Sequence, residues 1–325
     1  MKKVLVTREI PQKAIELLKS KFEVIVNKED RPMTREELLN YGKDCDAILT
    51  QLTDKIDRTV FETCSKVKIY ANYAVGYDNF DVVEGLNSGV ELTNTPDVLS
   101  ETTAELAWAL LFSVSRRIVE ADKYLRAGNW KQFKPTLLLG QDLRKKTVGI
   151  IGAGRIGKSF VQKCKSYDME ILYHNRSRDE IFERSYNARW TELDELLELS
   201  DIISVHVPLT TETNHLINKQ AFKKMKKNAI LINTARGAVI DETALIHALE
   251  EKLIWGVGLD VFENEPNVSE ELLKFDNVVL TPHIGSASEE TRTEMGILAA
   301  RNIIEVLEGR SAITSVYSEN KKKDN

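Results

Sequence analysis

The chain has little cysteine and no cysteine motif. Its 325 residues include only Cys45, Cys64 and Cys164, which are odd in number and lie far apart in the sequence. This excludes the disulfide frameworks of small secreted proteins and the paired cysteines of common zinc sites. So few cysteines are typical of a reducing compartment, and we expect the protein to be cytoplasmic.

Long apolar runs, histidine pairs and an excess of one charge are also missing. No run approaches the ~18 apolar residues of a membrane span, and the apolar run that begins at Val4 is too short for a secretory signal. The five histidines form no HxH or HExxH pair, so we expect no bound metal. The 45 basic and 50 acidic residues are interspersed, and we expect neither a nucleic-acid nor a membrane partner.

Short β-rich runs alternate with helical patterns along most of the chain. Strands that alternate with helices predict a parallel sheet with helices on both faces. We therefore expect an α/β protein with two Rossmann-like lobes, each built in this way. The runs of the first lobe are 3–7, 22–26, 47–50 and 68–70, and those of the second are 147–151, 169–174, 202–207, 229–234, 256–262 and 277–281.

Two long helical patterns divide the chain. The first, at 101–126, is largely apolar and lies between the two alternations, and the second, at 289–308, follows the last strand. Because the second helix can cross back to the first lobe, both ends of the chain would share one lobe. We predict one discontinuous domain of residues 1–100 and 289–325 and a second domain of residues 101–288.

A glycine-rich turn follows the first strand of the second lobe. It reads Gly152-Ala153-Gly154-Arg155-Ile156-Gly157 between a strand and a helical pattern, which is the context that a dinucleotide-binding turn requires. Gly152 permits the tight turn, Gly154 lets the backbone approach a pyrophosphate, and Gly157 lets the helix pack on the strand. Amides at the start of the helix can bind the phosphates. The alternative is a glycine-rich turn of some other α/β protein.

The next strand ends at Asn175, where NAD sites usually carry an acidic residue. An acid there would repel the 2′-phosphate of NADP(H), whereas Asn175 does not, and Arg176, Ser177 and Arg178 can bind a phosphate. The sequence therefore favours NADP(H) as the cofactor. If these arginines are only solvated, NAD(H) binds instead.

Three polar residues, Arg236, Glu265 and His283, follow three successive predicted strands. In parallel α/β sheets, ligands bind at the carboxyl ends of the strands, so these side chains should lie at the same edge as Gly152. A guanidinium, a carboxylate and an imidazole suit a substrate that carries a carboxylate. Each residue alone could be an ordinary loop residue, but together they indicate an active site.

The order of these motifs resembles the D-isomer-specific 2-hydroxyacid dehydrogenase family. The glyoxylate/hydroxypyruvate reductase branch is the most similar, with 2-ketogluconate reductases nearby. The matching segments are Gly152–Gly157, His206–Thr210, Asn233–Gly237, Gly258–Phe262 with Glu265 and Pro266, Thr281–Ser286, Ala74–Asn79 and Thr103–Glu105.

The resemblance implies an NAD(P)-dependent enzyme that reduces short 2-oxo acids, such as glyoxylate and hydroxypyruvate, to 2-hydroxy acids. Arg236 would bind the substrate, His283 would donate the proton, and Glu265 would hydrogen-bond to His283 and orient its ring. The discontinuous domain would bind substrate and the other would bind NAD(P), with the active site in the cleft between them.

Further contacts follow from the same resemblance. A homodimer formed through 101–126 and Trp130–Pro135 is also implied. Besides the glycine-rich turn, Asn175, Arg176 and Ser177, the cofactor would contact Thr103, Val207, Pro208, Thr234, Ala235, Arg236, Asp260, His283 and Gly285, and the substrate would contact Leu52, Val75, Gly76, Arg236 and His283.

Alternatives stay open within and outside this family. A 2-ketogluconate reductase or a phosphoglycerate-type dehydrogenase would share the same motifs. The fold also resembles nucleotide-sensing corepressors, which are binding proteins first and can keep the same three polar residues.

Overall fold

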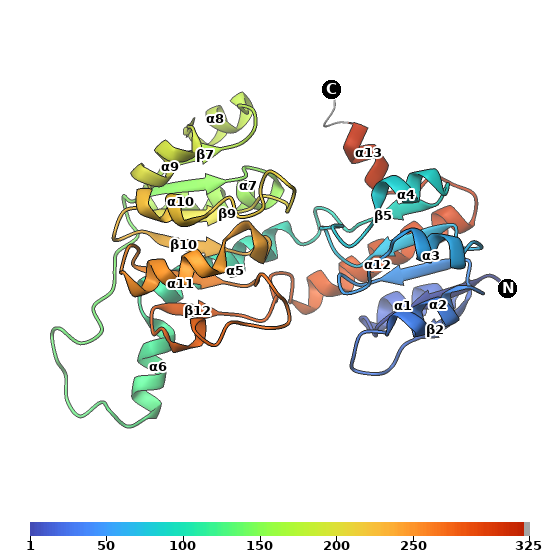
Figure 1. Cartoon of the computed structure of the whole chain (residues 1–325), viewed down its shortest axis with the longest axis horizontal. Coiled ribbons are helices and arrows are strands. Elements are labelled where there is room, and N and C mark those ends of the chain that lie inside the picture. Colours follow the sequence, from blue (N-terminus) through green and yellow to red (C-terminus); the bar gives the residue numbers. More distant parts are fainter. Residues whose placement is uncertain (322–325) are drawn as a thin grey trace. The chain divides into compact units, whose positions relative to one another are not determined.

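A computed structural model describes residues 1–321, whose contacts divide the chain into two compact units (Figure 1). Unit 1 contains Met1–Leu99 together with the segment that begins at Ser286, and unit 2 is Ser100–Gly285. Each unit is built around one parallel sheet flanked by helices. The expected α/β fold with two parallel sheets is therefore confirmed.

The sheet of unit 1 has five parallel strands in the order β2-β1-β3-β4-β5. Helix α12 packs against α1 and strands β3 and β4, while α2 and α3 contribute to a buried cluster with Leu5, Ile48 and Tyr70. The strands are β1 (Lys3–Val6), β2 (Glu23–Val26), β3 (Ala47–Thr50), β4 (Ile69–Asn72) and β5 (Glu91–Thr93), and the helices are α1 (Gln12–Lys19), α2 (Arg35–Gly42), α3 (Arg58–Thr63), α4 (Val82–Asn87), α12 (Glu289–Leu307) and α13 (Val316–Lys321).

The sheet of unit 2 has seven parallel strands in the order β12-β11-β10-β9-β6-β7-β8. The order reverses at β6, which is where a doubly wound sheet binds its ligand. The strands are β6 (Thr147–Ile151), β7 (Glu170–His174), β8 (Ala188–Trp190), β9 (Ile202–Val205), β10 (Ile230–Asn233), β11 (Gly256–Leu259) and β12 (Val278–Leu280).

Seven α-helices and three short 3₁₀ helices of unit 2 fall within the described part of the chain. The α-helices are α5 (Ser100–Ser115), α6 (Ile118–Arg126), α7 (Arg155–Cys164), α8 (Glu180–Tyr186), α9 (Leu193–Leu199), α10 (Lys219–Lys224) and α11 (Glu242–Glu250), and the 3₁₀ helices are η1 (Lys165–Tyr167), η2 (Gly237–Val239) and η3 (Leu272–Lys274). Helix α5 packs on α7 and on strands β10 and β11.

The long helix expected at 101–126 is wrong, because the structure has two helices there. Arg117 adopts a left-handed conformation with φ 52° and separates α5 from α6. The carbonyl of Ser115 accepts a hydrogen bond from the amide of Gln141, at 2.8 Å. A contact with a distant segment thus ends the first helix at Ser115, although the helical pattern of the sequence continues to residue 126.

Two strands, β5 and β8, were not predicted, so unit 2 has seven strands where six were expected. Each spans three residues, and polar residues interrupt the apolar pattern in both: Glu91 in β5 and Arg189 in β8. Both lie at the edge of a sheet. Their pairing with a neighbouring strand, rather than their composition, makes them strands.

The three cysteines are buried and free, and burial raises the pKa of each thiol, to about 11 for Cys45 and Cys64 and about 12 for Cys164. Such thiols are inert at neutral pH. Over residues 1–321, no helix combines the length and the hydropathy needed to cross a membrane. The cytoplasmic location stays a prediction.

Candidate active site

The glycine-rich turn joins β6 to α7 with the geometry that the sequence predicts. Gly152 has φ 96°, and a Cβ atom there would lie 2.8 Å from the backbone carbon of His206. A Cβ atom on Gly157 would lie 2.3 Å from the carbonyl oxygen of Gly152. Both positions therefore require glycine.

The space beside Gly154 fits the pyrophosphate of a dinucleotide. A Cβ atom at Gly154 would meet no other atom within 4 Å, so the backbone is open to a ligand on that side. Gly154 is the N-cap of α7, and no side chain caps the helix. The first amides of a helix have no partner within the helix, and together with the helix dipole they favour an anion.

Asn175 anchors this turn to the end of β7. Its Oδ1 accepts a hydrogen bond from the amide of Ala153, at 2.8 Å, and its carbonyl accepts one from Nε1 of Trp190, at 3.1 Å. Arg176 and Ser177 follow on the surface. The guanidinium of Arg178 forms two hydrogen bonds with Glu183, at 2.7 and 3.0 Å, an interaction that the sequence did not indicate.

One residue predicted to border the cofactor, Val207, lies close to this turn, and others follow neighbouring strands. A Cβ atom on Gly152 would lie 2.9 Å from Cγ1 of Val207, and Pro208 follows directly. Thr234 and Ala235 come immediately after β10. The hydroxyl of Thr234 is buried and has no hydrogen-bond partner among the described residues, as expected for a group that meets a ligand.

Asp260 organises the loop that carries His283. Its carboxylate accepts hydrogen bonds from the Thr281 hydroxyl at 2.6 Å and from the amides of Ile284 and Gly285 at 2.8 and 2.7 Å. Its carbonyl accepts a hydrogen bond from the amide of His283, at 2.9 Å. Burial raises the pKa of Asp260, although these hydrogen bonds favour the ionised form.

Thr103 of α5 belongs to the same cluster. A Cβ atom on Gly285 would approach Cγ2 of Thr103 to 3.3 Å and a carboxylate oxygen of Asp260 to 3.1 Å. The structure therefore brings together Thr103, Asp260 and Gly285, which are far apart in the sequence. The sequence indicated contact with a cofactor, but not that Asp260 holds the loop itself.

The imidazole of His283 is hydrogen-bonded to Glu265. The distance from Nδ1 of His283 to Oε2 of Glu265 is 2.8 Å, and Oε1 of Glu265 accepts a hydrogen bond from the amide of Phe262 at 3.0 Å. Burial alone would raise the pKa of Glu265, but the hydrogen bond and charge of His283 outweigh it, so the pKa is lowered. The carboxylate is ionised at neutral pH and orients the ring.

Arg236 lies on a neighbouring loop and contributes to the same electrostatic field. Its positive charge also lowers the pKa of Glu265. A Cβ atom on Gly237 would lie 1.9 Å from the carbonyl carbon of Phe262, so the Arg236 loop packs directly on the loop that leads to Glu265. The loop is held by the buried Asn233, which accepts a hydrogen bond from the amide of Ala235 and donates one to the carbonyl of Arg236.

A second histidine–carboxylate pair was not predicted. Nε2 of His215 lies 2.7 Å from Oε1 of Glu263, and the amide of Glu263 donates to Oε1 of Glu242 at 2.6 Å. Glu263 is two residues before Glu265, so these contacts fix the start of the loop that carries Glu265. Nothing in the spacing of His215 and Glu263 could have identified this pair. No group of three metal-ligating side chains occurs within residues 1–321.

The predicted substrate residues of unit 1 lie at the carboxyl edge of its own sheet. Leu52 is in the turn after β3, and Val75 and Gly76 are in the loop after β4. The carbonyl of Val75 accepts a hydrogen bond from Asn94, and that of Gly76 accepts one from Asn72, each at 2.8 Å.

Comparison with known proteins identifies the family. The model of the D-isomer specific 2-hydroxyacid dehydrogenase NAD binding domain matches residues 108–285. The chain belongs to this family. It is therefore an oxidoreductase with a nicotinamide-cofactor domain, as its motifs predicted.

Individual relatives resemble the chain over nearly its whole length. A glyoxylate reductase of Pyrococcus horikoshii is 50% identical over 321 residues, covering 98% of this chain and 96% of that protein. A crystal structure from Thermus thermophilus has a TM-score of 0.92 and 40% identity, covering 97% and 99% of the two chains. An NADPH-dependent glyoxylate/hydroxypyruvate reductase of Sinorhizobium meliloti, solved with NADP and malonate, has a TM-score of 0.85 and 34% identity, covering 97% and 96%.

Proposed function

We propose that the protein reduces short 2-oxo acids, above all glyoxylate and hydroxypyruvate, to the corresponding 2-hydroxy acids. The observation that carries the proposal is the Glu265–His283 hydrogen bond, which lies next to the Arg236 loop. The same unit carries the glycine-rich turn. The half-identical glyoxylate reductase of Pyrococcus horikoshii supports this choice of substrate.

In this proposal His283 is the acid of the reaction. A nicotinamide cofactor held by the glycine-rich turn would supply the hydride that the carbonyl carbon needs. His283 gives a proton to the carbonyl oxygen, which completes the alcohol. Glu265 holds Nδ1, so Nε2 is the nitrogen that transfers the proton. Arg236 binds the carboxylate of the substrate through its planar guanidinium.

We assign cofactor binding to the middle of the chain and substrate binding to its two ends, 1–100 and 289–325. The match of the NAD binding domain model to residues 108–285 supports the first assignment. The proposed cofactor contacts are the glycine-rich turn, Asn175, which is hydrogen-bonded to it, and Thr234 and Asp260, which follow strands β10 and β11. Leu52, Val75 and Gly76 are the proposed substrate contacts of unit 1.

A panel of cofactors and substrates tests the proposal. NADPH and NADH are each combined with glyoxylate, hydroxypyruvate, pyruvate and 2-ketogluconate, and the loss of absorbance at the reduced nicotinamide is followed. We expect the highest kcat/KM with glyoxylate or hydroxypyruvate. The highest value with 2-ketogluconate would favour that reductase, and cofactor binding without turnover of any substrate would favour a nucleotide-sensing protein. Oxidation of a phosphoglycerate would favour a dehydrogenase of that type.

We propose that NADP(H) is preferred to NAD(H). Asn175 lacks the charge that repels a 2′-phosphate, and Arg176 and Ser177 follow it on the surface. The NADP complex of the Sinorhizobium meliloti relative supports this preference.

Asn175→Asp should move the preference toward NADH. The carboxylate can still accept the hydrogen bond of the Ala153 amide, so the turn keeps its anchor and only the charge changes. Like charges in contact cost about 1–4 kcal/mol, so the NADPH/NADH ratio of kcat/KM should fall by about fivefold to several hundredfold. Asn218→Asp is the control, because an aspartate can also cap α10. A wild type that prefers NADH would contradict the assignment of Arg176 and Ser177.

Glu265→Gln should change the pH dependence of reduction. The pKa of Glu265 is lowered, so the wild-type carboxylate stays charged down to acidic pH, and it lies 2.8 Å from Nδ1 of His283. Glutamine keeps the hydrogen-bonding capacity but not the charge, so the rate should begin to fall at a lower pH than in the wild type. The difference in kcat/KM between Glu265→Gln and the wild type should become smaller at acidic pH, as measured between pH 5 and 9. If kcat/KM were reduced by the same factor at every pH, Glu265 would only orient the ring.

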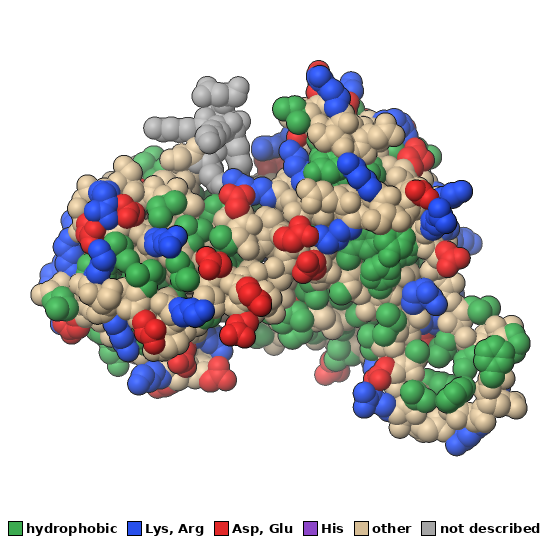
Figure 2. Space-filling model, turned by 180° about the vertical axis from the view of Figure 1, so that it is seen from behind, with side chains coloured by type: hydrophobic (Ala, Val, Ile, Leu, Met, Phe, Trp, Pro, Cys, Tyr) green, Lys and Arg blue, Asp and Glu red, His purple; other side chains and the backbone are tan. Residues whose placement is uncertain are grey.

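We also propose a homodimer formed through α6 and the segment that follows it. Large apolar side chains are exposed there, including Trp130 (57%), Phe133 (81%) and Leu139 (59%). Figure 2 shows apolar side chains gathered on this projecting part of the molecule. Exposed apolar patches of this kind mark interfaces, and two-fold dimers are the commonest oligomers. A monomeric mass by light scattering at micromolar concentration would contradict the proposal.

A further inference from the structure

Four strands of unit 1 place a polar side chain at the same edge of the sheet. Thr7 follows β1, Thr50 ends β3, Asn72 ends β4 and Asn94 follows β5. All four residues are at most 2% exposed. Because the strands are parallel, the two turns that contain Leu52 and Gly76 leave the sheet at this edge.

Three consecutive carbonyls in the second turn are fixed by this edge. The carbonyl of Ala74 accepts a hydrogen bond from the amide of Thr95 at 2.8 Å. Those of Val75 and Gly76 accept hydrogen bonds from the side-chain amides of Asn94 and Asn72, also at 2.8 Å. A buried carbonyl seldom lacks a partner, so these contacts set the orientation of the peptide planes.

The direction of the carbonyls determines the direction of the amides. In a trans peptide, C=O and N–H point to opposite sides of the chain. A carbonyl of Ala74 held toward the sheet edge turns the N–H of Val75 away from it, and the carbonyl of Val75 does the same for the N–H of Gly76. Two successive N–H groups held on the side away from the sheet edge offer two donors to one anion.

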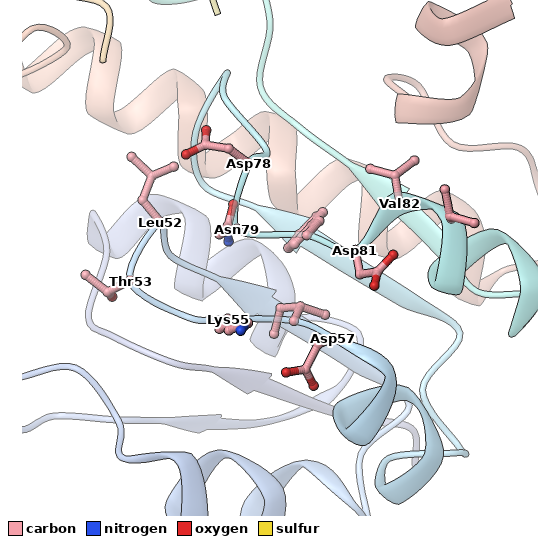
Figure 3. A pocket seen from close by; sticks show the side chains of 11 residues that line it. Leu52, Thr53, Lys55, Asp57, Asp78, Asn79, Asp81 and Val82 are labelled. Carbon is pink, nitrogen blue, oxygen red and sulfur yellow. The ribbon is translucent and has the colours of Figure 1, made fainter. Parts of the chain in front are cut away.

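Asn79 links this turn to the turn that carries Leu52. Its Nδ2 donates to the carbonyls of Gln51 and Asp54, at 3.1 and 3.0 Å, and its Oδ1 accepts from Nδ2 of Asn72 at 3.0 Å. The two turns border a pocket of about 760 Å³ whose lining includes Leu52, Asp78 and Asn79. Figure 3 shows Asn79 between the turn of Leu52 and the turn of Asp78.

We propose that Asn72, Asn79 and Asn94 are positioning residues that aim the N–H groups of Val75 and Gly76 at the carboxylate of the substrate. The inference rests on the proposed function, because it takes the ligand of these N–H groups to be a 2-oxo acid. In this proposal the asparagines do not bind the substrate themselves. They act through the backbone of the loop, and Asn79 keeps the Leu52 turn in register with it.

The test compares Asn94→Ala and Asn79→Ala with Leu38→Ala. Leu38 lies on α2 in the buried cluster of unit 1, and its apolar side chain forms no hydrogen bond with the asparagines. Its truncation therefore reports the effect of lost stability alone. We expect the KM for glyoxylate to rise about tenfold in both asparagine variants, as for a weakened hydrogen bond to a charge. We expect kcat to change less than about threefold and Kd for NADPH less than about twofold, because both substitutions alter loops of unit 1, whereas the glycine-rich turn and His283 belong to unit 2.

Hydrogen exchange gives a second measurement that does not depend on turnover. Both asparagine variants should exchange faster in residues 51–54 and 74–79, with the strands of the sheet unchanged. If the wild type reduces no 2-oxo acid, the proposed function fails, while exchange still reports whether the asparagines hold the loops. An unchanged KM in an active Asn94→Ala variant, an equal rise in Leu38→Ala, or unchanged exchange in both loops would overturn the inference.

Discussion

Replacing His283 by alanine should lower kcat/KM for glyoxylate by about 10²–10⁴-fold, the usual contribution of a positioned general acid. The proton for the carbonyl oxygen must then come from water, which is neither oriented by Glu265 nor charged. NADPH binding should change much less than kcat/KM, because the glycine-rich turn and Asn175 are untouched and only the contact of His283 itself is lost. Steady-state kinetics and fluorescence titration of NADPH measure the two effects separately.

The matched control for this variant is His247→Ala. His247 is an exposed histidine of α11 in the same unit, so its loss removes an imidazole without disturbing the Glu265 pair. We expect wild-type kinetics from it. If His283→Ala kept more than a tenth of the wild-type kcat/KM, the proton donor would have to be sought elsewhere, with His215 beside Glu263 the first residue to examine.

Arg236→Lys should be almost as damaging, although it keeps the positive charge. A guanidinium binds a carboxylate through two parallel hydrogen bonds, which an ammonium group cannot reproduce. Hydrogen bonds to charged groups contribute about 1.5–3 kcal/mol, so the loss should be about 10–150-fold in kcat/KM. We expect most of it as a higher KM for the 2-oxo acid, with NADPH affinity changed less.

Arg184→Lys serves as the control for the same chemical change. Arg184 forms an ion pair with Glu180 on α8, and its side chain is 78% exposed, so the substitution should be neutral. Near-normal KM and kcat in Arg236→Lys would show that Arg236 does not bind the carboxylate. In that case the N–H groups of Val75 and Gly76 would be the remaining candidates for binding the carboxylate.

The sequence predicted features that depend on local backbone geometry. Gly152 and Gly157 could be identified because the tight turn and the close packing of α7 exclude any side chain, and that requirement shows as spaced glycines. That Glu265 and His283 lie together could be predicted because each follows a strand of the same parallel sheet, and the carboxyl ends of such strands meet at one edge.

Features that depend on distant contacts could not be predicted in this way. The break at Arg117 accompanies a hydrogen bond from Gln141 to Ser115, and β5 and β8 are three-residue edge strands defined by pairing. The pairing of His215 with Glu263 joins residues 48 positions apart. In each case the partner is brought near only by the folded chain.

The asparagines of unit 1 illustrate the same limit. Asn72 and Asn79 are seven positions apart, yet nothing in their spacing indicates that one amide accepts a hydrogen bond from the other. Their role depends on the edge where β3, β4 and β5 end. The carbonyls that these asparagines bind come near them only in the folded chain.

The proposed function requires that hydride pass from a bound nicotinamide to the carbonyl carbon of a 2-oxo acid. The most direct test uses NADPH deuterated at both C4 positions with glyoxylate, followed by mass spectrometry of the product. We expect glycolate one mass unit heavier than that made with ordinary NADPH, with the label on the carbinol carbon and one NADPH consumed per glycolate formed. Unlabelled glycolate, or NADPH consumption that does not depend on glyoxylate, would contradict it.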